Sequence, residues 1–301
     1  MRIGLDVAQT CAERAGCAWV ADALAKALVR SCPDDRFFLY HHFGAWLNHS
    51  TKQGTDLRGA NVTSPLREFS RWQAHRLWSN VQKGTRSLPG QPEIVHAHSY
   101  QAPRVDPARL VFTVHDLSFW ICPEYTTEPI RLMCQEGVLQ ALSRAAAFVF
   151  VSGSAKGDFE RVLPGFVDRT NPLMHVVRLG SRYSPLAGRI QKESAAPWCF
   201  VGSVEPRKNL DALLEAMPLY WSGSRRRRKL VLAGGRGWNS QGLWKKISGL
   251  QNAGLVEHLG YVSDESLQAL YQKSFALVFP SFYEGFGLPL VEAMSQSCPL
   301  I

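Results

Sequence analysis

The chain has 301 residues, of which 46% are hydrophobic and 11% aromatic, enough for a sizeable core and too apolar for a disordered chain. Its net charge of +9 favours an anionic partner, which leaves phosphorylated small molecules, a lipid surface and nucleic acid open. The seven cysteines are scattered without a Cys-x-x-Cys pair, so we expect a reducing cytoplasm and neither a disulfide framework nor a metal site.

The first 180 residues alternate short apolar runs with longer amphipathic segments. No run of about 18 apolar residues occurs, so we expect no membrane span and at most attachment to a membrane surface. The alternation is typical of βαβ units around a parallel sheet. The predicted strands are 2–7, 37–43, 93–98, 110–117, 148–152 and 175–180, and the predicted helices lie near 18–31, 130–145 and 154–163.

A polar stretch with two prolines, residues 181–197, interrupts this pattern and is predicted to be an interdomain linker. The alternation then restarts. The predicted strands are 198–204, 229–235, 256–260 and 275–279, and the predicted helices begin near Asn209, residue 240, Asp264 and Leu288.

The sequence thus predicts two α/β domains, residues 1–180 and 198–301, and ligands bind such sheets at the carboxyl ends of the strands. Ser263 is the predicted N-cap of the helix that follows it. The last four residues, "CPLI", have the apolar character of a strand that is just beginning, and a domain of about 100 residues is short. We therefore expect the second domain to be incomplete.

The segment "FALVFPSFYEGFGLPLVEAM", residues 275–294, carries Glu284 and Glu292 on either side of a glycine turn and a helix start. Proline suits the first turn of a helix, and the free amides of residues 285–288 favour a phosphate or a sugar hydroxyl. A fully helical segment would separate the two carboxylates by about 12 Å along its axis. This spacing favours two separate roles on one ligand, although a solvated loop residue and a helix-dipole partner would show the same pattern.

Arg207 and Lys208 follow a predicted strand and precede a helix in "FVGSVEPRKNLDALLEAM". Cations oppose the dipole at a helix start, so an anion such as a diphosphate is expected between them. Two solvated residues of a surface loop are the alternative.

Three further features have both a functional and a structural interpretation. His115 ends a strongly apolar strand, where a neutral ring would hydrogen-bond a reacting sugar or merely pair with its surroundings. Gly16 precedes a helix, a weak signal for a phosphate or acceptor loop. The run Arg225 to Lys229 is typical of a solvated loop, or of attraction to an anionic membrane. No aromatic residues alternate with these cations, so nucleic acid is not an expected partner.

Five segments of the chain, taken in order, resemble the retaining glycosyltransferases of family 4. They are "GLD", "RAG", "TVHDLSFWICPEYT", "VGSVEPRKNLDALLEAM" and "LGYVSDESLQALYQKSFALVFPSFYEGFGLPLVEAM". The resemblance is almost continuous over the second half and absent from 40–90 and 181–197. It implies the GT-B architecture, in which two Rossmann-like domains face a cleft, and transfer of a hexose from a nucleotide-diphosphate sugar with retention of configuration. It requires no metal or other cofactor.

The same resemblance implies roles for individual residues. Glu284 matches the glutamate that contacts the donor sugar, Glu292 matches the one that accepts hydrogen bonds from the nucleotide ribose, and His115 matches a histidine that reaches the donor sugar. Arg207 and Lys208 match the pair that holds the diphosphate. The amides that would contact sugar and phosphates belong to Gly285, Phe286, Gly287 and Leu288.

The amino-acid sequence of these motifs resembles mannosyltransferase-like members of the family. We therefore expect GDP-mannose as donor and a glycan or lipid-linked acceptor of surface polysaccharide synthesis. The basic, tryptophan-containing region 40–90 suits an acceptor at an anionic bilayer, and neutralising Arg67, Arg71 and Arg76 would test this. Two departures from the family stand out. Ala18 replaces a second glycine of the first loop, and the elements that follow the last strand are missing. A truncated, inactive remnant or a non-catalytic partner is therefore the alternative, and a phosphorylase or epimerase of the same architecture is a third.

Overall fold

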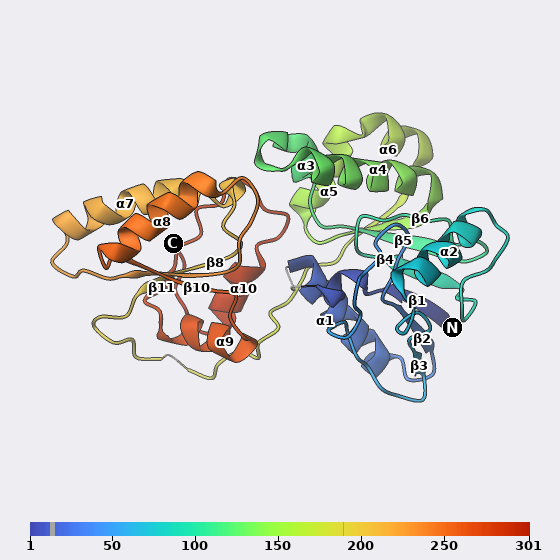
Figure 1. The fold of residues 1–301 in the computed structure, drawn as a ribbon, viewed down its shortest axis with the longest axis horizontal. Helices are drawn as coiled ribbons and strands as arrows, with labels where there is room; N and C mark the ends of the chain where they lie inside the picture. Colours follow the sequence, from blue (N-terminus) through green and yellow to red (C-terminus); the bar gives the residue numbers. More distant parts are fainter. Residues whose placement is uncertain (13–15, 189) are drawn as a thin grey trace. The chain divides into compact units, whose positions relative to one another are not determined.

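The structure, a computed structural model, describes residues 1–12, 16–188 and 190–301. The chain forms two compact units (Figure 1). The first comprises Met1–Trp120 and Pro129–Leu179, and the second comprises Ile121–Glu128 and Gly180–Ile301. Each unit contains one parallel sheet with helices, which agrees with the predicted α/β class.

The sheet of the first unit has seven strands in the order β3-β2-β1-β4-β5-β6-β7, all paired in parallel. From β1 the chain adds strands on one side, toward β3, and from β4 it adds them on the other side, toward β7. The strand order thus reverses between β1 and β4, whose carboxyl ends lie next to each other. The strands are β1 (Arg2–Asp6), β2 (Arg36–Tyr40), β3 (Val62–Thr63), β4 (Ile94–Ala97), β5 (Arg109–Val114), β6 (Ala145–Phe150) and β7 (Leu173–Val176).

Helices connect these strands and cover the sheet with apolar side chains. Ala25 of α1 packs with Leu5 of β1 and with Phe37 of β2. Phe159 of α5 lies against Phe148 of β6, with ring centroids 5.1 Å apart. The helices are α1 (Gly16–Ser31), α2 (Arg71–Gln82), α3 (Ser118–Ile121), α4 (Glu128–Arg144), α5 (Gly153–Val162) and α6 (Pro164–Thr170), with short 3-10 turns η1 (Ala8–Cys11) and η2 (Pro123–Tyr125).

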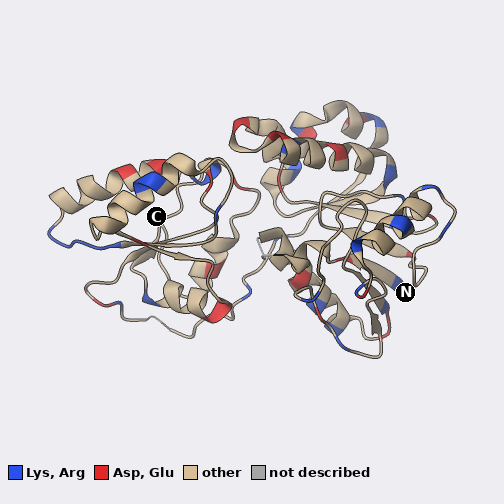
Figure 2. Ribbon diagram, in the orientation of Figure 1, with Lys and Arg blue, Asp and Glu red and all other residues tan. Residues whose placement is uncertain are grey.

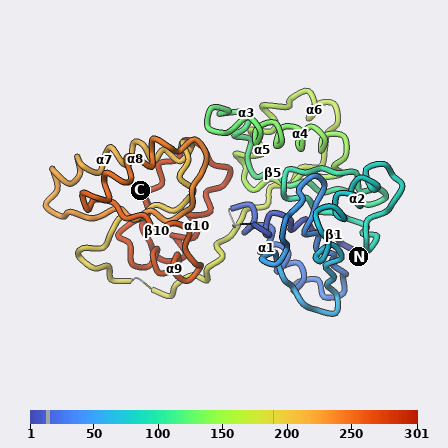
Figure 3. The backbone as a smooth tube through the Cα atoms, in the orientation of Figure 1, coloured from blue at the N-terminus to red at the C-terminus, as the bar shows by residue number. Residues whose placement is uncertain are grey.

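The second unit has a four-stranded parallel sheet in the order β10-β9-β8-β11, and Figure 3 traces its chain from Gly180 to α10. Its strands are β8 (Trp198–Val201), β9 (Leu230–Ala233), β10 (Val256–Gly260) and β11 (Ala276–Leu277). Its helices are α7 (Leu210–Gly223), α8 (Gln241–Asn252), α9 (Asp264–Lys273) and α10 (Leu288–Ser295), with the 3-10 turn η3 (Pro206–Lys208).

Two apolar layers cover the two faces of this sheet. Side chains alternate along a strand, so Phe200 of β8 joins the layer under α7 and α8, whereas Cys199 and Val201 join the layer under α9 and α10. Figure 1 shows these helix pairs on opposite sides of the sheet. A doubly wound sheet of this kind leaves the strand-to-helix turns at its carboxyl edge for a ligand.

Several predicted boundaries hold. Ser263 caps α9, where its side chain accepts a hydrogen bond from the Ser266 amide. The terminal segment pairs with β11, since the amide of Ile301 donates to the carbonyl of Leu277 at 2.9 Å. The strand predicted at 37–43 ends at Tyr40, and neither α2 nor β3 was predicted.

The predicted linker, residues 181–197, contains no helix or strand among its described residues, yet it belongs to the second unit. Lys192 donates to the carbonyls of Tyr271 and Gln272 at the end of α9. Residues 121–128, placed in the first domain by the sequence, also belong to the second unit. The predicted linker is therefore packed as part of the second unit.

One prediction about the basic run 225–229 is wrong for a single residue. Arg228 is buried, its guanidinium lies 3.9 Å above the centre of the Phe275 ring, and it donates to the carbonyl of Ala196 at 2.7 Å. The exposed Arg225, Arg226 and Arg227 fit the predicted solvated loop.

Candidate active site

The turn after β8 places the predicted diphosphate-binding pair at the edge of the second sheet. Arg207 and Lys208 belong to η3, and Asn209 then takes a left-handed conformation with φ of 53° before α7 begins at Leu210. The Asn209 side chain donates to the carbonyl of Pro280 at 3.2 Å, which fastens this turn to the one that follows β11. Two neighbouring strand ends thus bring the two motifs together.

The turn after β11 carries the glycine motif. Gly287 has φ of 88° and precedes α10, and a Cβ atom there would lie 3.0 Å from Leu290. The positive φ explains the need for glycine, since other residues are strained in this region. Gly285, Phe286 and Leu288 flank it, so the predicted amides do lie at the start of α10.

The carboxylate of Glu284 lies between the two cations. Arg207 Nη1 is 3.2 Å from Glu284 Oε2, and Lys208 Nζ forms a short ion pair with Glu284 Oε1. The anion between Arg207 and Lys208 is thus a carboxylate of the chain itself, and the predicted diphosphate contact stays a prediction. Glu284 and the basic pair, 77 and 76 residues apart, form one site.

A second carboxylate completes this charge cluster. Glu205 Oε1 pairs with Arg207 Nη2 at 2.8 Å, and Arg207 Nη1 also donates to the carbonyl of Tyr283 at the same distance. Burial raises the pKa of Glu205, against the opposing effect of Arg207 and Lys208. Two cations and two carboxylates balance here, so an incoming anion has to displace or outcompete a carboxylate.

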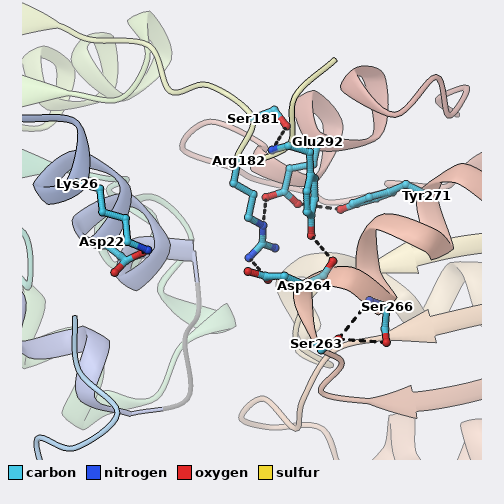
Figure 4. Close-up of polar contacts among 10 residues, drawn as sticks. Asp22, Lys26, Ser181, Arg182, Ser263, Asp264, Ser266, Tyr271 and Glu292 are labelled. Carbon is cyan, nitrogen blue, oxygen red and sulfur yellow. Dashed lines mark hydrogen bonds and ion pairs between the residues drawn. The ribbon is translucent and has the colours of Figure 1, made fainter. Parts of the chain in front are cut away.

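Glu292 lies in a separate, buried network (Figure 4). Its Oε1 is 3.0 Å from Arg182 Nε, and its Oε2 accepts a hydrogen bond of 3.0 Å from the Tyr271 hydroxyl. Arg182 Nη1 also pairs with Asp264 Oδ1 at 2.9 Å. Burial raises the pKa of Glu292, and Arg182 and Tyr271 act in the opposite direction.

Glu292 is only 4% exposed, and both of its oxygens are engaged. The structure thus gives Glu292 a structural partner, Arg182, which the sequence analysis missed. Arg182 lies in the polar stretch taken as a linker, where no apolar periodicity indicated packing. Because Glu292 is buried, the predicted contact with a ribose requires a neighbouring side chain such as Arg182 or Tyr271 to move.

His115 lies at the carboxyl end of β5 in the first unit. It is buried, and its Nε2 lies 3.0 Å from the carbonyl of His98, which only accepts, so Nε2 carries the proton. Burial lowers the pKa of His115, which favours the neutral ring. Its Nδ1 is then the nitrogen that can accept a hydrogen bond.

Residues that the sequence analysis did not single out surround His115. The His98 ring lies 6.2 Å and the Tyr100 ring 6.0 Å from the His115 ring, measured between centroids. Asp6, at the end of β1, accepts hydrogen bonds from the amides of His98 and Ser99 at 3.0 Å. The pattern "HAHS", residues 96–99 at the carboxyl end of the predicted strand 93–98, was the signal that could have found them.

Gly16 is the first residue of α1, as predicted for the opening of a helix. Residues 13–15, which would complete the first loop, lie outside the described residues. The role of Gly16 as a phosphate or acceptor loop stays a prediction. Among the described residues, no helix combines the length and apolar character needed to cross a bilayer.

Residues 191–301 match the family model of Glycosyl transferases group 1. This part of the chain is a glycosyl transferases group 1 domain. The chain is also 34% identical over 199 residues to O-antigen chain mannosyltransferase B of Escherichia coli, an alignment that covers 64% of this chain and 52% of that protein. The chain thus spans about half the length of this relative.

Solved structures support the fold assignment. Sucrose-phosphate synthase from Thermosynechococcus elongatus has a TM-score of 0.68 at 17% identity, and the match covers 100% of this chain and 80% of that chain. HepE from Anabaena, solved in complex with UDP-glucose, has a TM-score of 0.63 at 17% identity, with coverage of 100% and 79%. At such identity the likeness shows the fold alone, and the predicted GT-B class is confirmed.

Proposed function

We propose that this protein is a retaining glycosyltransferase that moves mannose from GDP-mannose to a glycan or lipid-linked acceptor of surface polysaccharide synthesis. The glycosyl transferases group 1 domain and the similarity to an O-antigen mannosyltransferase support the reaction class and the sugar. The HepE complex with UDP-glucose supports a nucleotide-diphosphate sugar as the type of donor. The proposed location is the cytoplasm, at the inner surface of the membrane.

The observation that carries this proposal is the contact of Glu284 with both Arg207 and Lys208. A donor diphosphate is more highly charged than one carboxylate and matches the fork of an arginine. It would take the place of Glu284 on the two cations. Glu284 is then released beside the sugar, where the resemblance to the family expects it.

The transfer step follows from these charges. The bond between the anomeric carbon and the diphosphate oxygen breaks, its electron pair stays on that oxygen, and a bond forms from the anomeric carbon to the acceptor hydroxyl. With attack on the face that the leaving group vacates, the hydroxyl proton passes to the departing phosphate oxygen. Negative charge develops on the leaving oxygen, and it is stabilised by Arg207, Lys208 and the amides of residues 285–288. This stabilisation is stronger in the transition state than in the ground state. No metal is needed in this scheme.

His115 is proposed to act through Nδ1 on a hydroxyl group of the donor sugar. A neutral ring suits this task, since it accepts a hydrogen bond without adding positive charge near the breaking bond. Glu292 is proposed to bind the nucleotide ribose after one of its present partners moves. Gly16 remains the proposed first-loop residue toward the acceptor.

The test is release of GDP or UDP from a panel of sugar nucleotides by this chain, with and without a mannose-terminated lipid-linked acceptor. GDP release from GDP-mannose that rises with acceptor, and an α-linked product from the α-linked donor, is the expected result. Silence with every donor contradicts the proposal. Calorimetric binding of GDP without any turnover would instead favour the non-catalytic alternative.

A further inference from the structure

The surface of α2, in the first unit, carries a hollow that the proposed transfer does not use. Its cavity of about 420 Å³ is lined in part by Trp72, Arg76 and Leu77 of α2, by Phe69 just before the helix, and by Arg86 after it. Ser70 starts α2 with a capping box in which Gln73 returns the hydrogen bond, so the first turn is well fixed. The hollow is therefore built on a rigid element.

The two tryptophans of α2 have opposite environments. Trp78 is buried, donates to the carbonyl of His42 at 3.1 Å and packs edge-on against Phe43. Trp72 is 68% exposed although it is a large apolar ring. The core therefore accounts for Trp78 and leaves Trp72 facing solvent.

Positive charge surrounds the exposed ring. The Arg76 guanidinium lies 5.7 Å from the centre of the Trp72 ring, one helical turn away. Among the described residues, neither Arg76 nor Arg86 has a carboxylate within ion-pair distance. No Asp or Glu occurs from Phe69 to Pro92, whereas four cations do: Arg71, Arg76, Lys83 and Arg86. In Figure 2, the blue segments on α2 mark its basic residues.

The structure narrows the set of basic residues that the sequence suggested. Arg67 pairs with Asp56 at 2.7 Å and is largely covered, so it is not available to a partner. Arg71 Nη1 lies 3.1 Å from His49 Nε2. The pair that combines exposure, a cavity and a neighbouring aromatic ring is Arg76 with Arg86.

We infer that this hollow, defined by Trp72, Arg76 and Arg86, binds the phosphate group of an anionic phospholipid in a bilayer. An indole ring favours the interfacial region, and arginine side chains beside it pair with phosphate while their stems contact the acyl boundary. This inference deepens the proposed membrane location but does not depend on the proposed transfer reaction. Its test measures lipid binding and not catalysis.

The test is sedimentation of the full chain with vesicles of phosphatidylglycerol and phosphatidylcholine, and with phosphatidylcholine alone. The wild-type chain binds the anionic vesicles and not the neutral ones. Arg76→Gln with Arg86→Gln lowers the partition coefficient roughly 20- to 30-fold, because each of the two removed cations ordinarily contributes about fivefold. Equal binding to both kinds of vesicle contradicts the inference.

A matched control separates this site from net charge. Arg225→Gln with Arg226→Gln removes the same charge from exposed positions of the second unit. We expect less than a threefold change for it, and a loss equal to that of the α2 pair overturns the inference. Inorganic phosphate at millimolar concentration competes weakly, and full displacement by it would indicate a free-anion site instead of a lipid site.

A second readout locates the ring. Lipids brominated near the headgroup should quench part of the tryptophan fluorescence of the wild-type chain, and Trp72→Phe should remove that part. Persistent quenching in Trp72→Phe would place another tryptophan at the bilayer and contradict the inference. Unchanged far-ultraviolet circular dichroism of the variants checks that they fold.

Discussion

The carboxyl edges of the two sheets differ in charge. The edge of the second sheet presents Arg207, Lys208 and Glu284 in one cluster of ion pairs. The edge of the first sheet presents His98 and His115, whose pKa values burial holds below the ordinary value of 6.5. Ion-paired cations suit a diphosphate, and neutral imidazole rings suit the hydroxyl groups of a sugar.

The largest expected effect comes from removing the cations of the charged edge. Arg207→Met with Lys208→Met should lower kcat/KM for GDP-mannose by roughly 10³-fold or more, because both groups that stabilise the leaving diphosphate are lost. Steady-state GDP release measures it. Lys246→Met, an exposed lysine of α8 paired with Asp211, is the control and should change kcat/KM less than twofold.

Glu284→Gln should lower kcat roughly 10²-fold, since the carboxylate beside the sugar is replaced by a neutral group of the same shape. KM for the donor should not rise, because the amide no longer competes for Arg207 and Lys208. Single-turnover kinetics separates the two effects. A variant in which KM rises while kcat stays constant would assign Glu284 to binding alone.

The third prediction concerns the buried network of Glu292. Arg182→Met should lower the free energy of unfolding of the second unit by roughly 2 to 4 kcal/mol, since it leaves the buried Glu292 carboxylate without its cation. Urea unfolding followed by circular dichroism measures it. Arg161→Met removes an exposed partner of Asp158 and should cost less than about 1 kcal/mol. Equal effects of the two changes would remove Arg182 from its structural role.

The smallest expected effect tests the buried histidines of the first sheet. Burial lowers the pKa of His96, beside His98, to about 4. The folded-state pKa of His96 lies below its unfolded-state pKa, so lowering the pH protonates the unfolded chain first. The stability that the neutral His96 ring contributes is therefore complete above pH 6.5 and is lost as the pH falls toward 4. Wild type should lose about 2 kcal/mol more than His96→Gln between pH 7 and pH 5. Parallel urea-unfolding curves at both pH values would contradict it.

Much of the fold was predictable from local patterns. The alternation of apolar runs and amphipathic segments gave the parallel α/β class, and Ser263 followed by Asp264 and Glu265 gave the start of α9. Helix α2 was missed because its tryptophans and arginines hide its apolar face, which is Ala74, Leu77, Trp78 and Val81.

The site was predictable in its members and less so in its contacts. Each motif marks a strand-to-helix turn, so Arg207, Lys208 and Glu284 could be named separately. Their ion pairs depend on β8 and β11 being neighbours in the sheet, which no local pattern states. Arg182 and Arg228 were missed for a related reason, because only tertiary packing buries a cation against Glu292 or Phe275.

The central claim is that Glu284 holds the place of a diphosphate on Arg207 and Lys208. The most direct measurement is a calorimetric titration of GDP into the wild-type chain and into Glu284→Gln at one fixed salt concentration. GDP should bind the variant at least as tightly as wild type, and up to several-fold more tightly, because no carboxylate competes. A tenfold or larger loss of GDP affinity in Glu284→Gln would contradict the claim.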